Sequence, residues 1–348
     1  MDLREKRALD LFGIELPIVQ APMAGATTPE MVIAVSEAGG LGSLPSARYS
    51  EKELRDALDV VRRGTGRPFN VNFFCHAEPR DDPARETVWR RRLEPYYIEA
   101  GLDPSTPVAK GRRAPFGDAF CAIVEEYRPP VVSFHFGLPA SPLLERVRRT
   151  GAKITSSATT VDEARWLEER GVDAVIAMGA EAGGHRGSFL TDDMSTQVGT
   201  MALVPRIVDA VAIPVIAAGG IVDQRGVAAA FALGAAAVQV GTAYLFTPEA
   251  SIPGVHKNAL LARDRDTAIT NLFTGRPARS IVNRLMSEIG PLSKDVPDFP
   301  TAGGALAPLQ RAAEARGSDD FSPMWAGEAF ALAKPMTARE LTRNLAGL

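Results

Sequence analysis

The chain has 348 residues, of which 45% are hydrophobic and 23% charged, a balance that is typical of a folded globular protein with a large core. Lys and Arg number 39 against 42 Asp and Glu, so the net charge is −3 and no basic surplus exists to neutralise a nucleic acid. The two cysteines, Cys75 and Cys121, stand outside any metal-ligand spacing. We therefore expect no nucleic-acid partner, no disulfide framework and no bound metal.

The first residues, MDLREKRALDLFGIELPIVQAPM, contain no apolar run long enough for a signal peptide or a membrane span. The low cysteine count also suits a reducing compartment. The sequence therefore predicts a cytoplasmic protein without membrane contact.

Short apolar or β-branched runs alternate with amphipathic helical patterns along most of the chain. Near-continuous apolar runs such as PVIAA and AVQV suit a parallel sheet that is buried on both faces. Eight alternations over about 240 residues favour an α/β fold, a closed (β/α)8 TIM barrel, over an open doubly wound sheet. The expected helices include residues 28–38, 51–62, 161–170 and 227–233, and the eight expected strands are residues 17–21, 41–44, 68–74, 131–136, 153–156, 173–178, 214–218 and 236–240.

Two segments break this alternation. Residues 76–129 are charged, contain prolines and include a helical stretch, RRRLEPYYIEAGL, and they are too long for one barrel connection. The tail beyond about residue 284 carries several prolines, with helices expected at 306–316 and from 325 onward. We assign residues 1–75 and 130–285 to the barrel, and residues 76–129 and 286–348 to a smaller, mostly helical domain that covers its mouth. Apolar residues of that domain could also face a second subunit, so a homo-oligomer stays open.

In a (β/α)8 barrel the active site lies just after the strands, at their carboxyl ends. The first such segment is QAPMAGATTPE, where Gly25 allows a close approach of the backbone to a planar ligand, although an ordinary turn explains it equally well. In NVNFFCH, the polar Asn72 needs hydrogen-bond partners, and we favour a ligand among them. His135 ends an apolar strand, where a satisfied core histidine is an equal alternative.

After the sixth strand comes MGAEAGGHRGSF, in which glycines surround His185 and Arg186. Core packing does not explain such a stretch, because glycines let backbone amides approach a ligand closely. A histidine there can act as a base or, when protonated, as the partner of an anion. His185 is thus the strongest single candidate for a functional residue.

The seventh and eighth strands end in two further loops, at Gly219 and Gly220 and at Gln239, Gly241 and Thr242. Adjacent glycine-rich loops after these two strands are the usual phosphate site of a TIM barrel, since free N–H groups and a helix end attract the anion. No GxGxxG, P-loop or GxSxG motif competes with this interpretation.

The strings QAPMAGATTPE, NVNFFCH, VVSFHFGLP, EAGGHRG, IAAGGI and QVGTAYL, in this order, resemble those of the nitronate monooxygenases, formerly called 2-nitropropane dioxygenases. The resemblance runs from about residue 17 to 284 and more weakly through the tail. It implies an FMN-containing barrel that oxidises alkyl nitronates, of the propionate 3-nitronate type, with O2 to a carbonyl compound and nitrite.

By the same resemblance, His185 is the active-site histidine and His135 a second histidine near the flavin. The implied cofactor-binding residues fall into two groups. Those beside the flavin ring are Pro22, Met23, Ala24, Asn72 and Met178, and those nearer the phosphate end are Gly183, Gly184, Gly219, Gly220, Gln239, Val240, Gly241 and Thr242.

The chain departs from the family pattern in places. Met178 stands where members often have Gln, and a thioether cannot donate a hydrogen bond. The tail reads Phe299–Pro300 where members often have Tyr-Pro, and tyrosine and lysine groups that some members place over the flavin have no evident counterpart. Arginines 90–92, or Arg112 and Arg113, could serve a carboxylate-bearing substrate, although a solvated helix face or loop is the interpretation we favour.

A nitronate is an anion, so a histidine beside it offsets the desolvation of its charge. We expect His185 to position the nitronate and to take the proton from neutral nitroalkanes. The nearest alternative is an FMN enzyme on the same barrel that takes electrons from NAD(P)H to reduce a quinone or an enoyl thioester. Two others are a phosphate-binding isomerase or lyase without redox function, and a flavin-binding protein that has lost its activity.

Overall fold

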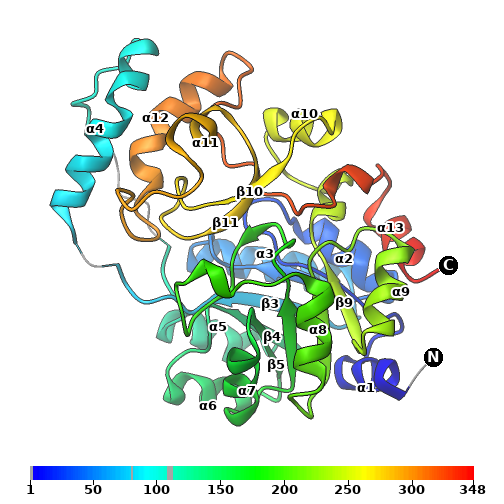
Figure 1. Cartoon of the computed structure of the whole chain (residues 1–348). Helices are drawn as coiled ribbons and strands as arrows, with labels where there is room; N and C mark the ends of the chain where they lie inside the picture. The colour runs from blue at the N-terminus through cyan, green and yellow to red at the C-terminus, as the bar shows by residue number, and fades with distance from the viewer. Residues whose placement is uncertain (1–2, 80, 108–112) are drawn as a thin grey trace.

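The computed structural model describes residues 3–79, 81–107 and 113–348. Eight parallel strands pair in the order β1-β9-β8-β6-β5-β4-β3-β2, and a parallel bridge between Val19 and Leu41 brings the two end strands together. The predicted (β/α)8 barrel is therefore confirmed, with each strand inside or within two residues of its expected range (Figure 1). These strands are β1 Ile18–Gln20, β2 Gly42–Pro45, β3 Phe69–Phe74, β4 Val131–His135, β5 Lys153–Ala158, β6 Ala174–Met178, β8 Val215–Ala218 and β9 Ala237–Val240.

The barrel helices follow from apolar spacing and local capping. In α3, for example, Ser50 and Glu53 form a capping box, and Leu54, Leu58 and Val61 form a buried stripe. Within the described ranges, no helix combines the length and the apolar character that crossing a bilayer requires. The helices around the barrel are α1 Leu3–Phe12, α2 Pro29–Glu37, α3 Glu51–Gly64, α5 Asp118–Tyr127, α6 Ser141–Arg149, α7 Val161–Glu169, α8 Thr200–Val208, α9 Gln224–Ala232 and α13 Ala338–Leu345, with short 3-10 turns η1 Met194–Thr196, η2 Thr242–Phe246 and η3 Phe330–Leu332.

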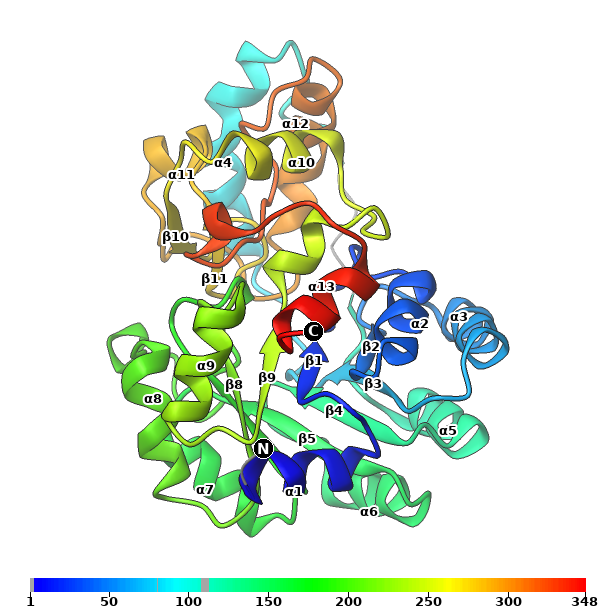
Figure 2. The same cartoon turned by 90° about the vertical axis from the view of Figure 1, so that its right-hand side faces the viewer.

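A second group of elements lies together at one end of the barrel, above it in Figures 1 and 2. It has its own hydrophobic cluster, in which Trp89 and Leu93 pack with Leu306 and Leu309. A three-stranded antiparallel sheet, in the order β10-β11-β7, links this group to the barrel because β7 belongs to the loop after β6. The elements are α4 Pro83–Glu99, β7 Gly184–His185, α10 Gly254–Ala262, β10 Thr267–Thr270, β11 Ala278–Ile281, α11 Arg284–Ile289 and α12 Gly303–Glu314.

The packing differs from the expected division of the chain at three places. Helix α5 lies within residues 76–129, yet its apolar face joins the barrel core, as Phe120 and Val124 do. Strands β10 and β11 precede residue 285 but pair outside the barrel sheet. Helix α13 returns from the tail to pack on α2 and α9, with Leu341 and Leu345 in the barrel core. Local composition gave no sign of these contacts, because each depends on which distant apolar face is available to cover the helix or strand.

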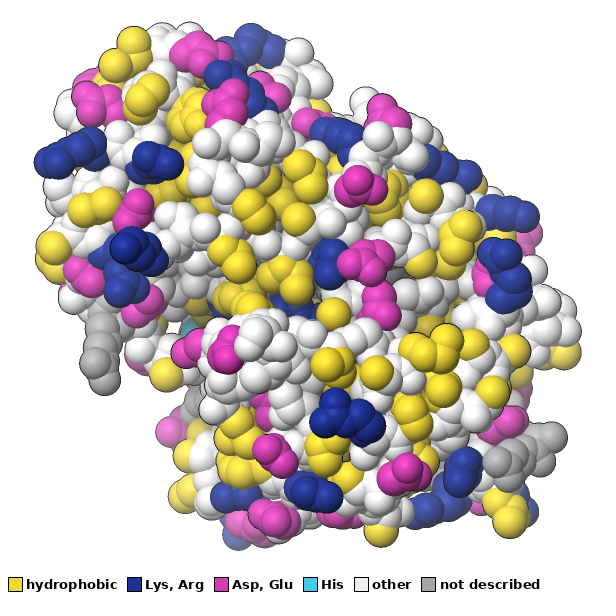
Figure 3. All heavy atoms as spheres, in the orientation of Figure 1, with side chains coloured by type: hydrophobic (Ala, Val, Ile, Leu, Met, Phe, Trp, Pro, Cys, Tyr) yellow, Lys and Arg dark blue, Asp and Glu magenta, His cyan; other side chains and the backbone are white. Residues whose placement is uncertain are grey.

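The surface in Figure 3 carries Lys and Arg interspersed with Asp and Glu. It is hollowed between the part that holds α4 and α12 and the part that holds the barrel, and histidine atoms are visible in this hollow at the left. The boundary between the two groups of elements is thus open to solvent on this face.

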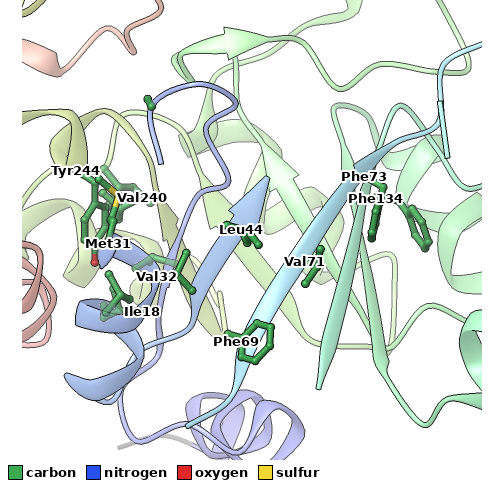
Figure 4. Close-up of a cluster of buried hydrophobic side chains, with 14 of the residues drawn as sticks. Ile18, Met31, Val32, Leu44, Phe69, Val71, Phe73, Phe134, Val240 and Tyr244 are labelled. Atoms are coloured by element: carbon green, nitrogen blue, oxygen red, sulfur yellow. The ribbon is translucent and has the colours of Figure 1, made fainter. Parts of the chain in front are cut away.

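The barrel has two apolar layers, one between strands and helices and one inside the strands. In the outer layer, Ile18, Leu44 and Val71 pack against helix residues such as Met31 and Val32 (Figure 4). Val19, Ile176 and Ile216 belong to the inner layer, which Ala8 and Phe12 of α1 join. Side chains alternate between these two layers along each strand. The residues at the carboxyl ends of the strands are therefore the ones available to line a site at that end of the barrel.

Candidate active site

A cavity of about 470 Å³ lies at the carboxyl ends of the barrel strands. Its walls come from the segments that follow the strands, from the loop with β7, and from the C-terminal tail around Trp325. Among the predicted residues, the structure brings these to the cavity: Pro22, Met23, Ala24, Asn72, His135, Met178, Gly183, Gly184, His185, Gly219, Gly220, Gln239, Gly241 and Thr242.

Val240 is the exception among the predicted residues. Its side chain is 1% exposed and belongs to the core between strands and helices, near Tyr244 and Met31 in Figure 4. The reason is the alternation of side chains along β9, which turns Gln239 towards the cavity and Val240 away from it. Val240 can therefore offer a ligand its backbone only.

The two glycine-rich loops have unpaired backbone donors. In the described chain, the N–H groups of Gly219, Gly220 and Gly241 donate to no protein acceptor. Gly219 and Gly220 have φ angles of +118° and +71°, a conformation that L side chains rarely adopt. Unpaired amides beside a cavity are the donor set that an anionic phosphate group needs, so these loops fit the phosphate end of a nucleotide-type cofactor.

Gly183 has a packing role that the sequence did not reveal. A Cβ atom at this position would lie 2.5 Å from the backbone nitrogen of Gly327 and 2.6 Å from the carbonyl carbon of Ala326. The Gly327 N–H in turn donates to Thr242 Oγ1 at 2.9 Å, and the Glu328 N–H donates to the Glu181 carbonyl at 3.0 Å. Gly183 thus lets the tail lie directly on the loop that carries His185.

The side chains expected beside a flavin ring are only partly free. Asn72 donates from Nδ2 to Ser133 Oγ at 3.0 Å, so its amide nitrogen is already engaged within the protein. Met23 begins a turn in which its carbonyl accepts from the N–H groups of Ala26 and Thr27. Met178 lines the cavity with its side chain, while its carbonyl accepts from Arg186.

His135 has a defined neutral tautomer. Its Nε2 lies 3.2 Å from the carbonyl oxygen of His185, which can only accept, so Nε2 carries the proton. Its Nδ1 then accepts from Ser157 Oγ at 2.6 Å. Burial, followed by the charge of Arg276, lowers the pKa of His135 to about 3. This imidazole is uncharged at neutral pH and anchors the His185 loop.

His185 lies in β7, among aromatic rings. The ring centroids of Phe299 and Trp325 are each 5.3 Å from that of His185, and its Nε2 is 2.9 Å from Thr274 Oγ1. Burial, with the charge of Arg113 as the next cause, holds the pKa of His185 well below its ordinary value. Of the two roles expected for this residue, the site therefore favours the neutral base over the cation.

Arg186, next to His185, is a structural residue. It is 1% exposed and donates from Nη2 to the Met178 carbonyl and from Nη1 to the Gly179 carbonyl, each at 2.8 Å. Its Nε donates to Gln197 Oε1 at 2.9 Å. The guanidinium therefore fixes the end of β6, from which the His185 loop departs.

Sequence reasoning missed several residues of the cavity wall. They come from loops and from the tail, where no periodicity or motif marks them, and they include Arg48, His256, Phe273, Thr274, Trp325 and Phe330. Of the arginines considered for substrate binding, Arg113 lines the cavity, Arg91 and Arg92 are exposed on α4, and Arg112 lies outside the described residues. The one sequence signal for these residues is Trp325 itself, a large aromatic residue in a tail that is otherwise rich in polar residues and prolines.

The chain forms a closed (β/α)8 barrel with unpaired amides in the loops after its last two strands and a buried neutral histidine at its mouth. These features define a cofactor-dependent TIM-barrel enzyme. A family model described as nitronate monooxygenase matches residues 5–347. The chain belongs to the nitronate monooxygenase family.

Individual relatives agree with this membership. Nitronate monooxygenase from Pseudomonas aeruginosa is 42% identical over 338 residues, which cover 96% of each chain. The structure of nitroalkane oxidase from Streptomyces ansochromogenes is 38% identical and matches with a TM-score of 0.87 over 98% of this chain and 97% of that one. FabK from Thermotoga maritima is 30% identical, with a TM-score of 0.71 over 97% and 94% of the two chains.

The predicted activity is therefore confirmed: the chain is an oxidoreductase that acts on nitronates. The family and its structural neighbours are flavoproteins, so a flavin is the expected cofactor of this cavity. The comparisons do not favour the alternative of a nicotinamide-dependent reductase.

Proposed function

We propose that the chain binds FMN in this cavity and oxidises alkyl nitronates of the propionate 3-nitronate type with O2, releasing a carbonyl compound and nitrite. The observation that carries this proposal is the pairing of two features in one cavity: unpaired amides at the ends of β8 and β9, and the neutral imidazole of His185. The unpaired amides can bind a phosphate. The neutral, buried imidazole suits an organic substrate, because the site around it excludes water.

In this proposal, the residues that hold the phosphate end are Gly219, Gly220, Gln239, Gly241 and Thr242. Pro22, Met23, Ala24, Asn72 and Met178 would face the ring, with Gly183 and Gly184 between the two ends. When bound, FMN supplies the redox chemistry between nitronate and oxygen, which no side chain of the cavity can supply.

His185 can act in either of two ways because its partner is a hydroxyl. If Thr274 Oγ1 donates to Nε2, then Nδ1 carries the proton and can donate to a nitronate oxygen. If Nε2 donates to Thr274 Oγ1, then Nδ1 is a free base for the acidic carbon of a neutral nitroalkane. The same neutral imidazole can thus act on both substrate forms without first being protonated by solvent.

The elements outside the barrel form the proposed covering domain. Phe299 and Trp325 come from these segments and lie against His185, where they exclude water from the reacting group. From the packing, we place α4, β10, β11, α11 and α12 in this domain and return α5 and α13 to the barrel. Helix α10 lies beside this domain, but Ala259 and Leu260 join the barrel core, so we keep it with the barrel. The cytoplasmic location and a homo-oligomeric state stay predictions from the sequence.

The test uses the purified holoenzyme. We expect a flavin absorption spectrum, release of FMN on denaturation, and O2 uptake matched by nitrite release with propyl 1-nitronate and with propionate 3-nitronate. Anaerobic mixing with NADH or NADPH should leave the flavin oxidised. A colourless protein, or rapid bleaching by a nicotinamide without turnover of either nitronate, overturns the proposal in favour of an isomerase or of a reductase, respectively.

A further inference from the structure

The charged side chains of the cavity differ in how many hydrogen-bond partners they have within the protein. Among the described residues that line it, the charged ones are Arg48, Arg113, Glu181 and Glu314. Glu181 accepts from the N–H and hydroxyl of Thr200, and Glu314 accepts from side chains of α12 and the tail. The guanidinium groups of Arg48 and Arg113 donate to no acceptor in the described part of the chain. The acids are engaged within the protein, whereas the two cations face the cavity without a counter-ion among the described residues.

Arg113 lies close to the reaction centre. Its Cζ is 5.5 Å from the ring centroid of Phe299, and the same ring is 5.3 Å from the ring of His185. Its charge is also the second cause, after burial, of the lowered pKa of His185. One aromatic ring is therefore in contact with both the unpaired guanidinium and the imidazole that we assign to the nitronate.

The backbone of Arg113 is held in place. His76 is 6% exposed, and its Nε2 donates to the Arg113 carbonyl at 2.9 Å, while its ring lies 4.8 Å from that of Phe299. Arg48 extends to the same wall, where a Cβ atom on Gly25 would collide with its guanidinium. Arg48 follows β2 and Arg113 follows α4, the helix inserted after β3, whereas the amide loops follow β8 and β9. The two cations and the amides therefore come from different segments of the cavity wall.

This arrangement is unfavourable without an anion. Burial, and next the like charge of Arg48, lowers the pKa of Arg113 to about 10, so the side chain remains charged at neutral pH. A partly buried charge that lacks a partner costs free energy, which a bound carboxylate recovers through paired, charge-assisted hydrogen bonds. The phosphate of the cofactor does not need this pair, because the β8 and β9 loops already offer amides for it.

We propose that Arg113, assisted by Arg48, binds a carboxylate carried by the substrate at the end opposite its nitronate group, and so selects dianionic over monoanionic nitronates. This inference rests on the proposed function. Arg113 is then a specificity-determining residue, with His76 as the residue that positions it. His185 then meets the nitronate and Arg113 meets the carboxylate, and the Phe299 ring that contacts both residues holds them in place.

The test compares two substrates that differ in the carboxylate, propionate 3-nitronate and propyl 1-nitronate. In Arg113→Gln we expect KM for propionate 3-nitronate to rise by about 10- to 100-fold, the range of one charge-assisted pair, with kcat changed by less than about threefold. KM for propyl 1-nitronate should stay within about threefold of the wild-type value. Arg113→Lys should recover part of the loss because it restores the charge without the planar fork.

Two further measurements separate recognition from damage. Butyrate, which has the carboxylate but no reacting carbon, should inhibit the wild type competitively and inhibit Arg113→Gln at least about 10-fold more weakly. Arg63→Gln, on the exposed face of α3, is the matched control and should change nothing. Flavin content shows that each variant is folded and loaded.

Equal rises in KM for both nitronates would show that Arg113 binds the nitronate group, and unchanged KM values would show that it binds neither group; both results overturn the inference. If the wild type oxidises neither nitronate, the proposed function fails instead. This result differs from a failure of the Arg113 assignment, in which the wild type is active and only the effect of the variant on the two KM values departs from expectation.

Discussion

The Nε2 atom of His135 lies 3.2 Å from the main-chain carbonyl oxygen of His185. This hydrogen bond joins the tip of β4 to β7, the short strand that carries the other histidine of the cavity wall. It also fixes the His135 proton on Nε2, since a carbonyl oxygen can only accept. The first histidine is therefore a structural support for the second, and both are held in their neutral forms by burial.

The buried histidines predict a loss of stability in mild acid. Burial is the main cause that lowers the pKa of His76 and His256 to about 4 and that of His135 to about 3. The folded chain therefore stays neutral at these sites, while the unfolded chain takes up protons below its ordinary pKa of about 6.5. Stability contributed by the neutral forms is present above pH 6.5 and declines as the pH falls towards 4.

Each of these histidines should lower the free energy of unfolding by about 2 kcal/mol between pH 8 and pH 5, which corresponds to 1.5 pH units at about 1.4 kcal/mol each. Urea unfolding of the holoenzyme at the two pH values measures the change. The fall should be smaller by about one such increment in His256→Asn. Equal free energies of unfolding at pH 8 and pH 5 would contradict the buried, neutral assignment.

His185→Asn should cripple turnover without releasing the flavin. The imidazole lines the cavity beside Thr274 and does not belong to the loops assigned to the phosphate, and general acid–base groups typically contribute about 10²- to 10⁴-fold to a rate. Nitrite release with propyl 1-nitronate measures the loss, and the flavin spectrum serves as the control for loading. Wild-type turnover in this variant would remove His185 from the mechanism.

Arg186→Met should destabilise the fold and loosen the wall of the cavity. The variant removes the Arg186 donors from the Met178 carbonyl and from Gln197 Oε1, and it leaves the Gly179 carbonyl only the Ala182 N–H. This loss should cost about 3 kcal/mol in the free energy of unfolding. Arg186→Lys should recover only part, because one ammonium cannot reproduce the two parallel donors of a guanidinium. The matched control is Arg206→Met on the exposed face of α8, and a comparable loss in that variant would contradict the assignment.

Gly183→Ala should displace the tail from the His185 loop. The added methyl group would meet the backbone of Ala326 and Gly327, which cannot move without breaking the bond from the Gly327 N–H to Thr242. We expect a loss of about 2 kcal/mol in the free energy of unfolding and a weaker hold on the flavin, measured by dialysis against buffer. Gly254→Ala, where a Cβ atom meets nothing within 4 Å, is the control. If Gly183→Ala matches this control in the free energy of unfolding and in flavin retention, the tail can shift to accommodate the methyl group, and the assignment is wrong.

The barrel and most of its cavity wall follow from local sequence features. Apolar runs at regular intervals mark the eight strands, and the rule that barrel sites lie at carboxyl strand ends points to His185, Gly220 and Gly241 from the sequence alone. The family resemblance implies Val240 as a cofactor-binding residue together with its loop, but a strand turns neighbouring side chains to opposite faces, so the Val240 side chain lies in the core.

Only the tertiary structure decided the rest. Arg113 and Trp325 are separated by more than 200 residues, and nothing near either one indicates that both reach the same cavity. The charge state of His185 also required the fold, because burial sets it and sequence spacing does not. The sequence by itself determined which residues stand at strand ends, since strand period and turn chemistry are local properties. Which distant loops close over those ends, and how dry the cavity becomes, depends on packing between segments far apart in the chain.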